Sequence, residues 1–451
     1  MPAEAARVVV SERTLSPLAR AQRARRIGTT FGRVYLGIKA NQLLEARVRP
    51  HDMRERWSRF NRRSAESIYE AAVDLRGLIL KGCQFMGSRS DVLPREYVEV
   101  LSKLQDRVPP KAFPVVRRVV EGELGRRVEE VFESFSERPI AAASLAQVHE
   151  ARLRGGERVA VKVQYPEVAT LVQSDLANLR VFFRAIGVIE RNFDLIPLID
   201  ELGAYVPREL DFVNEAANAE TAARQFAGRD DVRVPRIHHE FTTRRLLVME
   251  FIDGIRISDT ERLLAAGVDV HRVVQTLVEA YCEQVLVHGF FHADPHPGNL
   301  LVEPDGPRLV MLDFGLSKDL PEGFREAVVR VAVAMLRDDA EGLATALHDM
   351  GFETKSGERE ALRDAARFFL DFAARFRDRP YVDPRVFETL NDEIPDLVRR
   401  NPIVRIPGHV VLLGRVLGLL SGISRTLGSR VDLLRTLMPY ALGQHRPAPS
   451  A

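Results

Sequence analysis

The sequence predicts a two-lobed α+β fold, in which a small antiparallel sheet is preceded by a helical extension and followed by a mainly helical lobe. Two observations predict this class. Short runs of β-type residues gather between positions 131 and 164, whereas apolar residues at helical spacing dominate most of the remaining chain. The chain has 451 residues, of which 45% are hydrophobic and 28% charged, so it can bury the cores of two or three structural units.

The helical extension shows apolar residues at helical spacing over 31–48 and 64–87, after a basic and poorly patterned start. Prolines at 109, 110 and 114 end this pattern. From these changes in pattern we expect five segments: a basic arm and helix at 1–62, a helical extension at 63–128, a lobe with the sheet and inserted helices at 129–256, a helical lobe at 257–445, and a disordered tail at 446–451.

The sheet is predicted from strands at 131–135, 145–153 and 158–164, with a hairpin turn at 155–157. In the third strand, alternation places Val159, Val161 and Val163 on the core face and Lys162 on the other. A helical segment is expected over 168–225, of which about 168–205 is an insertion. Later strands are expected at 233–241, 245–254, 299–303 and 308–315, and the rest of the helical lobe is expected to contain helices alone.

Charge is distributed unevenly along the chain. Residues 1–63 hold 15 Lys and Arg against 5 Asp and Glu, and the remainder holds 50 against 58. A basic arm of this kind suits an anionic membrane surface, and a solvated Arg-rich helix pair is the alternative. The acidic body argues against nucleic acid as a partner.

Cys83 and Cys282 are too few for a disulfide framework, so we expect a reducing compartment. We find neither a signal-peptide pattern nor an uncharged apolar run of 18 residues. The apolar stretch 410–423 contains Arg415 and is predicted to be a buried helix. The expected location is cytoplasmic, peripheral to the inner membrane.

The segment "HADPHPGN" places Asp294 five residues before Asn299, and Asp313 begins a D-F-G sequence nineteen residues after Asp294. In phosphoryl transfer, a loop with this spacing offers a carboxylate to the acceptor and an amide oxygen to Mg²⁺, and the aspartate of D-F-G is the main metal ligand. We therefore expect ATP and Mg²⁺ as cofactors. His292 and His296 are expected to brace the loop, and metal binding is the alternative.

Lys162 in "VAVKVQ" matches a strand lysine that contacts nucleotide phosphates. Asp211 and Glu215 are four residues apart on a predicted helix, where two like charges are unfavourable unless a cation lies beside them. Glu215 is therefore the expected partner of Lys162, and a solvated acidic face is the alternative. These features predict a bilobal protein-kinase-like fold. No A-P-E sequence follows Phe314, which makes a peptide substrate doubtful.

Several segments together resemble the UbiB-type (AarF-domain) atypical kinase family over about residues 65–425. They are "LKGCQFMGSRSDVLPREYVEVLSKLQDRVPP", "PIAAASLAQVHEA", "VAVKVQYP", "ELDFVNEAAN", "VMEFIDG", "FFHADPHPGNLLV" and "LDFGL".

The resemblance implies nucleotide-binding roles for further residues. These are Lys81 and Gln84 of a K-x-G-Q-like motif, Glu209 and Asp211 of an E-x-D motif, Ala141, Ala142, Ala143 and Ser144 of an alanine-rich loop in place of a glycine loop, and Glu250 and Ile252 of "VMEFIDG". Cys83 stands where the family usually has glycine, with burial or a reactive thiol as the two interpretations. Because alanine disfavours positive φ, the loop is predicted to be a rigid turn with few free N–H groups.

The family is associated with isoprenoid quinone and related lipid metabolism at membranes. The resemblance therefore implies an Mg-dependent ATP-binding atypical kinase or ATPase, with nucleotide, an anionic membrane surface, a lipid or isoprenoid ligand and a biosynthetic protein complex as expected partners. Two alternatives remain at this point. One is a small-molecule phosphotransferase, since such enzymes share the H-x-D-x-x-x-x-N loop, and the other is a non-catalytic, nucleotide-binding scaffold.

Overall fold

The computed structural model describes residues 16–45, 49–87, 93–105, 110–143, 145–189, 203, 210–354, 359–376, 403–405, 407–429, 431 and 433–443. The chain forms two compact units. Unit 1 comprises Met1–Ala216 and Ile237–Phe251, and unit 2 comprises Ala217–Arg236 and Ile252–Ala451. Antiparallel sheets combined with many helices confirm the predicted α+β class. The expected disordered tail at 446–451 lies outside the described ranges.

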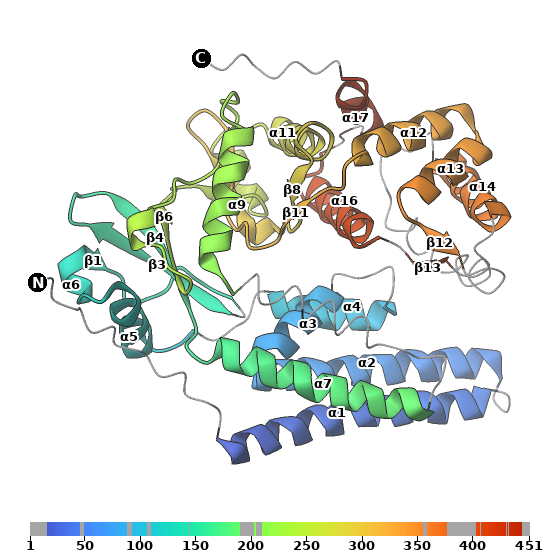
Figure 1. Ribbon diagram of the computed structural model, residues 1–451, viewed down its shortest axis with the longest axis horizontal. Helices are drawn as coiled ribbons and strands as arrows, with labels where there is room; N and C mark the ends of the chain where they lie inside the picture. The colour runs from blue at the N-terminus through green and yellow to red at the C-terminus, as the bar shows by residue number, and fades with distance from the viewer. Residues whose placement is uncertain are drawn as a thin grey trace, which may run out of the picture. The chain divides into compact units, whose positions relative to one another are not determined.

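Unit 1 contains a layer of packed helices. Its elements are α1 (Pro17–Glu45), α2 (Pro50–Leu75), α3 (Gly77–Gly87), α4 (Arg95–Leu101), the 3-10 helix η1 (Ser102–Gln105) and α7 (Val168–Ile189). Figure 1 shows α1 running beside α2 and α7, and α1 contacts both helices. Apolar side chains from these helices, among them Ile27, Ala72, Leu78 and Val172, form one buried core.

Two details of this layer differ from the prediction. Helix α1 begins at Pro17, within the segment that was expected to be poorly patterned, because buried contacts of Arg23 and Ile27 anchor its first turns. The single helical stretch predicted at 64–87 is broken at Arg76, which adopts φ 54° and is followed by Gly77 at φ 57°. Such positive φ values do not continue an α-helix.

The sheet of unit 1 has the strand order β1-β3-β4-β6, with β2 paired to β3, and every pairing is antiparallel. Its elements are β1 (Phe132–Phe135), β2 (Ala141–Ala142), β3 (Ala146–Leu153), β4 (Arg158–Gln164) and β6 (Leu246–Glu250), preceded by α5 (Phe113–Leu124) and α6 (Val128–Val131). The predicted alternation is present, since Val159, Val161 and Val163 share a buried core with α5. Leu247 lies opposite Lys162 and packs with Phe212 on the other face.

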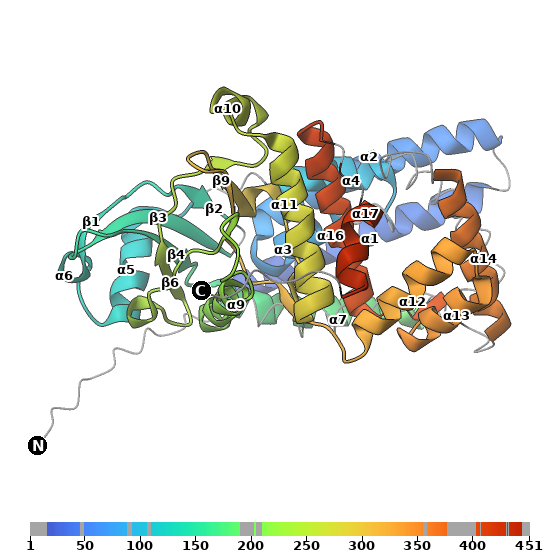
Figure 2. The same cartoon turned by 90° about the horizontal axis from the view of Figure 1, so that it is seen from above.

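Unit 2 is mainly helical, with short strand pairs. Its helices are α10 (Thr260–Ala265), α11 (Val270–Glu283), α12 (Phe324–Arg337), α13 (Ala340–Asp349), α14 (Arg359–Phe376), α16 (Gly408–Thr426) and α17 (Leu433–Ala441), with a π-helix η3 (Gln284–His288) and a 3-10 helix η4 (Pro297–Asn299). Figure 2 shows α12, α13 and α14 beside one another, and they share an apolar core. The division between the units falls within α9 (Phe212–Gln225).

The largest sheet of unit 2 has the order β5-β10-β9-β7, and separate two-stranded pairs are β8 with β11 and β12 with β13. The bounds are β5 (Val232–Arg233), β7 (Ile255–Arg256), β8 (Phe290–His292), β9 (Leu300–Glu303), β10 (Arg308–Met311), β11 (Ser317–Asp319), β12 (Glu353–Thr354) and β13 (Ile403–Arg405). Strands β9 and β10 lie where strands were predicted at 299–303 and 308–315. The expectation of helices elsewhere in this lobe was wrong, because strands of two or three residues are too short to show a period of two.

The strand predicted at 233–241 was also wrong. Only Val232–Arg233 is a strand there, Ile237 makes an isolated bridge to Met249, and His239–Phe241 form a 3-10 helix η2. Pro235 interrupts this segment and has no N–H to donate to a sheet ladder.

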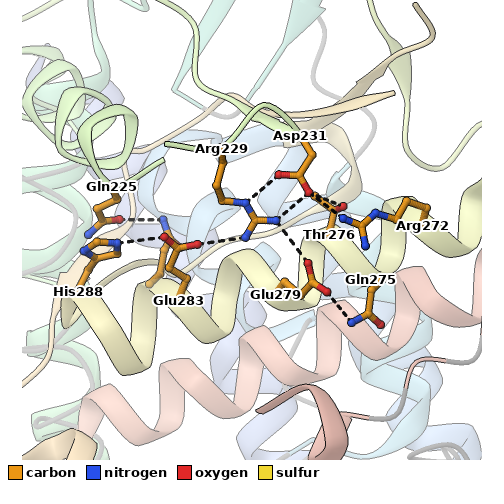
Figure 3. A network of polar contacts seen from close by, with 10 residues as sticks. Gln225, Arg229, Asp231, Arg272, Gln275, Thr276, Glu279, Glu283 and His288 are labelled. Carbon is orange, nitrogen blue, oxygen red and sulfur yellow. Dashed lines mark hydrogen bonds and ion pairs between the residues drawn. The ribbon is translucent and has the colours of Figure 1, made fainter. Parts of the chain in front are cut away.

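A polar network lies between α11 and the segment before β5 (Figure 3). The Arg229 guanidinium donates to Asp231 at 2.8 Å and to Glu283 at 3.1 Å, and lies 3.6 Å from Glu279. Arg229 is 13% exposed and the Glu283 side chain 4%. A guanidinium surrounded by several carboxylates joins these segments within unit 2.

Helix α16 confirms that residues 410–423 are helical, with Leu412, Val416 and Leu420 buried. Among the helices that the structure describes, none combines the length and the apolar character required to cross a membrane.

Candidate active site

In unit 1, Lys162 and Glu215 form the predicted ion pair. Lys162 Nζ lies 2.7 Å from Glu215 Oε1, and the two side chains are 11% and 4% exposed. Strand β4 places the lysine on the face opposite the valines, and α9 places the glutamate there. The ammonium also lies 5.2 Å from the centre of the Phe212 ring, close enough for a cation–π interaction.

Asp211 has a different position from the one predicted. Helix α9 begins at Phe212, so Asp211 does not share a helical face with Glu215. Its Oδ1 instead accepts the Val213 N–H at 3.1 Å, as an N-cap does, and its Oδ2 lies 3.3 Å from Arg244 Nε. The repulsion used to predict a cation beside Glu215 is therefore not the cause of the Lys162 pair.

The alanine-rich loop is part of a hairpin. Ala141 and Ala142 of β2 pair with Val148 and Gln147 of β3. The next N–H, that of Ala143, donates to the Ala146 carbonyl at 2.8 Å. None of these three alanines has a positive φ, as predicted for alanine in this loop, and two of them form a strand in place of a turn. The N–H of Ala143 is engaged by the protein itself, and Ser144 lies outside the described residues.

In unit 2, the segment 292–299 is a loop braced by its own backbone. The Asp294 carbonyl accepts the His296 N–H at 2.7 Å and the Asn299 side-chain amide at 3.3 Å. His296 Nδ1 accepts the Gly298 N–H at 3.1 Å. These bonds hold the loop in one conformation and agree with a bracing role for His296.

His292 is fully buried and hydrogen-bonds the Tyr281 hydroxyl through Nδ1 at 2.9 Å, while its ring packs against Phe314. Burial lowers the pKa of His292, although the charges of Asp294 and Asp313 oppose this shift. A buried imidazole with this hydrogen bond agrees with the predicted bracing role.

The two predicted metal ligands meet at one end of the β9–β10 hairpin. Leu300 pairs with Met311, so Asn299 immediately precedes the first paired residue and Asp313 follows shortly after the last. The Leu312 N–H donates to the Asn299 carbonyl at 2.9 Å, which joins the two segments. Asp313 Oδ1 also accepts the Gly315 N–H at 3.0 Å.

This donor set fits Mg²⁺. The ion prefers oxygen ligands and is usually held by one or two carboxylates, with water and substrate phosphates completing its shell. Asp313 supplies a carboxylate and Asn299 an amide oxygen. The residues that the structure describes contain no cluster of three His, Cys, Asp or Glu side chains that could hold a metal ion.

Sequence reasoning missed two side chains that contact these segments. Asn218 on α9 donates to the Phe314 carbonyl at 3.0 Å, and Arg415 on α16 lies 2.8 Å from Asp294 Oδ1. Asn218 belongs to the quoted segment "ELDFVNEAAN", and Arg415 was noted as the charge in an apolar stretch. Neither pattern indicates a partner 96 or 121 residues away.

The remaining predicted residues have simpler outcomes. Helix α3 contains Lys81 and Gln84, whose side chains are outside the described set, as is Glu209. Glu250 ends β6 opposite Val159, and Ile252 follows as a buried residue of unit 2.

Cys83 is buried in the helical core of unit 1, and burial raises the pKa of its thiol to about 12. Of the two interpretations of this cysteine, burial agrees with the structure.

The structure combines a mixed α+β architecture, a buried lysine–glutamate pair, and a hairpin that places Asn299 beside the segment of Asp313. Together these features indicate a protein of the kinase-like class. Residues 103–347 match the ABC1 atypical kinase-like domain, and the chain belongs to this family, also called AarF or UbiB. The resemblance drawn from the motifs is thereby confirmed.

Several curated relatives carry kinase names. The chain is 34% identical over 409 residues to Protein ACTIVITY OF BC1 COMPLEX KINASE 8, chloroplastic, of Arabidopsis thaliana, covering 84% of this chain and 54% of that protein. It is 33% identical over 387 residues to AarF domain-containing protein kinase 1 of Xenopus tropicalis, covering 82% and 72%. The chain thus spans about half the length of the plant relative.

Among solved structures, the complex of Rv3197 with erythromycin from Mycobacterium tuberculosis aligns with a TM-score of 0.58 at 24% identity. The alignment covers 83% of this chain and 94% of that one. At this level of identity, the alignment shows that the two chains share a fold.

Proposed function

We propose that this protein is an Mg-dependent, ATP-binding atypical kinase or ATPase. The observation that carries the proposal is the meeting of Asn299 and Asp313 at one end of the β9–β10 hairpin, in the unit that also holds Asp294. Phosphoryl transfer requires oxygen ligands for a metal on the phosphates and a group that orients the acceptor. The Lys162–Glu215 pair of unit 1 supports the same function, because it holds an ammonium suited to phosphate oxygens.

Each residue has a role in the proposed reaction. Asp313 and Asn299 would hold Mg²⁺, which when bound neutralises charge on the phosphates. Lys162 would donate to phosphate oxygens, with Glu215 keeping the ammonium in place. Asp294 would accept the proton of an acceptor hydroxyl or water. At the same time, the oxygen of that hydroxyl or water bonds to the γ-phosphorus. The bond from that phosphorus to the β–γ bridging oxygen then breaks, and ADP leaves.

We further propose that the reaction serves isoprenoid quinone or related lipid metabolism at a membrane surface. The family resemblance supports the pathway, and the name of the plant relative connects a kinase with activity of the bc1 complex. The net positive charge of residues 1–63 supports attraction to anionic lipid. Nucleotide, lipid and a biosynthetic complex are the proposed partners.

Nucleotide binding is tested by thermal unfolding with ATP or ADP, each with Mg²⁺ or with EDTA. Nucleotide at 100 times its Kd adds about 2.7 kcal/mol to the free energy of unfolding. We expect a metal-dependent rise in melting temperature in the wild type and its loss in Asp313→Asn. Asp319→Asn is the matched control, because Asp319 is an exposed carboxylate on β11. Absence of a rise with both nucleotides contradicts the proposal.

Turnover separates an enzyme from a scaffold. Asp294→Asn is expected to keep the Mg-nucleotide shift and lose phosphate release from ATP. If Asp294→Asn supports cellular function while Asp313→Asn does not, the scaffold is the better description. Rapid stoichiometric phosphorylation of a soluble amino alcohol or sugar would instead indicate a small-molecule phosphotransferase.

The metabolic role is tested by lipid and quinone profiling of a deletion strain complemented with wild type or Asp313→Asn. We expect the deletion to change the quinone profile and wild type alone to restore it. A profile that deletion leaves unchanged contradicts the quinone role.

A further inference from the structure

The carboxylate of Asp294 is held by a side chain from a distant part of unit 2. Arg415 Nη2 lies 2.8 Å from Asp294 Oδ1, and the two side chains are 10% and 17% exposed. Little water reaches either group, so their attraction is screened far less than that of a surface pair. Within the described residues, no hydrogen bond reaches the other oxygen, Oδ2.

Helix α16 fixes where this guanidinium lies. Leu412, Val416 and Leu420 recur every four residues and are 2% to 7% exposed, so one face of the helix is packed into the unit. Arg415 immediately precedes Val416 in an otherwise uncharged stretch, 410–423. An arginine anchored on a packed helix presents a planar fork of donors in a nearly fixed position.

The backbone of Asp294 is anchored separately from its side chain. Its carbonyl accepts bonds from His296 and Asn299, which fix the loop. Those bonds leave rotation about the side-chain torsions unrestricted, and the Arg415 contact removes that freedom.

The surroundings of Asp294 contain a second negative charge. Burial dominates the lowered pKa of His292, and the charges of Asp294 and Asp313 both act against it, so both carboxylates lie within electrostatic range of one ring. Arg415 acts on the same ring with the opposite sign.

We propose that Arg415 is a positioning residue for phosphoryl transfer, which holds Oδ1 of Asp294 so that Oδ2 faces the acceptor hydroxyl or water. The inference rests on the proposed function and adds α16 to the elements that build the site. It assigns Arg415 an effect on turnover and none on nucleotide binding.

The central test compares Arg415→Met with wild type in steady-state ATP hydrolysis. Methionine keeps much of the length of the side chain and suits an apolar helix. Because a displacement of about 1 Å can lower a rate by about 10²-fold, we expect kcat to fall by about 10-fold to 100-fold. The KM for ATP and the thermal shift with Mg-nucleotide should stay at their wild-type values.

Arg415→Lys is the conservative variant, and it still tests the proposal if Arg415→Met does not fold. Lysine keeps the charge and loses the planar fork, so we expect a kcat between those of Arg415→Met and wild type. The double variant Arg415→Met/Asp294→Asn should be no slower than Asp294→Asn alone, because residues that act as one unit do not give additive losses.

Arg229→Met is the control for stability. Arg229 is also a nearly buried arginine of unit 2 with carboxylate partners, but its contacts are with Asp231, Glu279 and Glu283 (Figure 3). We expect it to lower the melting temperature at least as much as Arg415→Met and to keep the wild-type kcat. A purely structural role of Arg415 would make the two variants alike.

The outcomes separate the two proposals. If wild type binds Mg-nucleotide and turns over, a kcat of Arg415→Met equal to wild type overturns the positioning role alone. A higher kcat also overturns it and identifies Arg415 as an inhibitory contact. If wild type gives neither a nucleotide shift nor hydrolysis, the proposed function itself fails and the role of Arg415 fails with it.

Discussion

Two buried ion pairs of unit 1 show how differently an arginine and a lysine are used. Arg23 on α1 donates to Asp175 on α7 through two nitrogens and also to the carbonyls of Leu75 and Arg76. Lys162 makes its contact with Glu215 through one compact ammonium beside an aromatic ring. The Arg23 guanidinium is surrounded by fixed acceptors. An ammonium such as that of Lys162 has no planar geometry to satisfy and can exchange one acceptor for another.

The position of the Arg23 contacts explains their role. They surround the break between α2 and α3, where Arg76 and Gly77 have positive φ. A Cβ added at Gly77 would lie 3.3 Å from the Leu171 Cβ, so α7 packs closely there. Arg23 therefore holds the beginning of the helix that carries Lys81 and Gln84. The comparison separates a pair that holds the α2–α3 break from a pair with a proposed role in phosphate binding, and four experiments test it.

The largest effect is expected for Arg23→Met. Removing one partner of a buried pair leaves the other charge uncompensated and costs about 3–5 kcal/mol, measured here by urea unfolding. Arg26→Met is the matched control on the same helix. Arg26 is 42% exposed and contacts Asp74 at 3.0 Å, so we expect a loss below about 1 kcal/mol.

The double variant Arg23→Met/Asp175→Leu should recover part of the lost stability, because it removes both charges together. If Arg23→Met and Arg26→Met unfold at the same urea concentration, Arg23 does not hold the α2–α3 break.

Glu215→Gln should affect function more than folding. Glutamine keeps the shape but loses the charge that holds Lys162, and removing one preorganised electrostatic partner costs about 10²-fold in turnover. Steady-state ATP hydrolysis and urea unfolding measure the two effects. Glu220→Gln, on the same helix, should leave hydrolysis unchanged. Equal turnover in both variants would contradict a role for the Lys162 pair.

Cys83 reports on α3, the helix that Arg23 holds. Its thiol pKa of about 12 leaves little thiolate at pH 9, where an unperturbed cysteine of pKa about 8.5 is mostly ionised. We expect iodoacetamide to label Cys83 at least about 10-fold faster in urea than in the native protein, and faster in Arg23→Met than in wild type.

The sign of the associated pH effect follows from the raised pKa. The folded state retains the thiol proton, so the stability contribution is complete below pH 8.5 and declines as the pH rises above the unfolded pKa of about 8.5. Native labelling of Cys83 as fast as that of the unfolded chain would contradict burial.

The smallest effect is expected for Arg244→Ala. The side chain of Arg244, which contacts Asp211, is 81% exposed. Exposed ion pairs contribute at most about 1 kcal/mol to the free energy of unfolding. Urea unfolding should detect little change. A loss as large as that of Arg23→Met would show that exposure does not separate the two kinds of pair.

The comparison of sequence with structure is clearest in the sheet and the helical layer. Alternation along β4 correctly separated the valines from Lys162, because strand side chains repeat every two residues. The break at Arg76 was not predicted, because apolar residues keep helical spacing on both sides of Gly77 and a single glycine does not by itself end a helix. The strands β8 and β11 were missed because each pairs with a distant segment and has too few residues for a periodic signal.

The sequence by itself determined the family, the order of the motifs, and the choice of Asn299 and Asp313 as the expected metal ligands, since local spacing records these. It also named Glu215 as the partner of Lys162, but the like-charge argument behind that choice does not hold in the structure. Tertiary structure alone decided that Arg23 is buried against Asp175 and that Arg415 reaches Asp294. These partners are 152 and 121 residues apart. Their meeting depends on how packed helices place charged side chains, and no period along the chain records that packing.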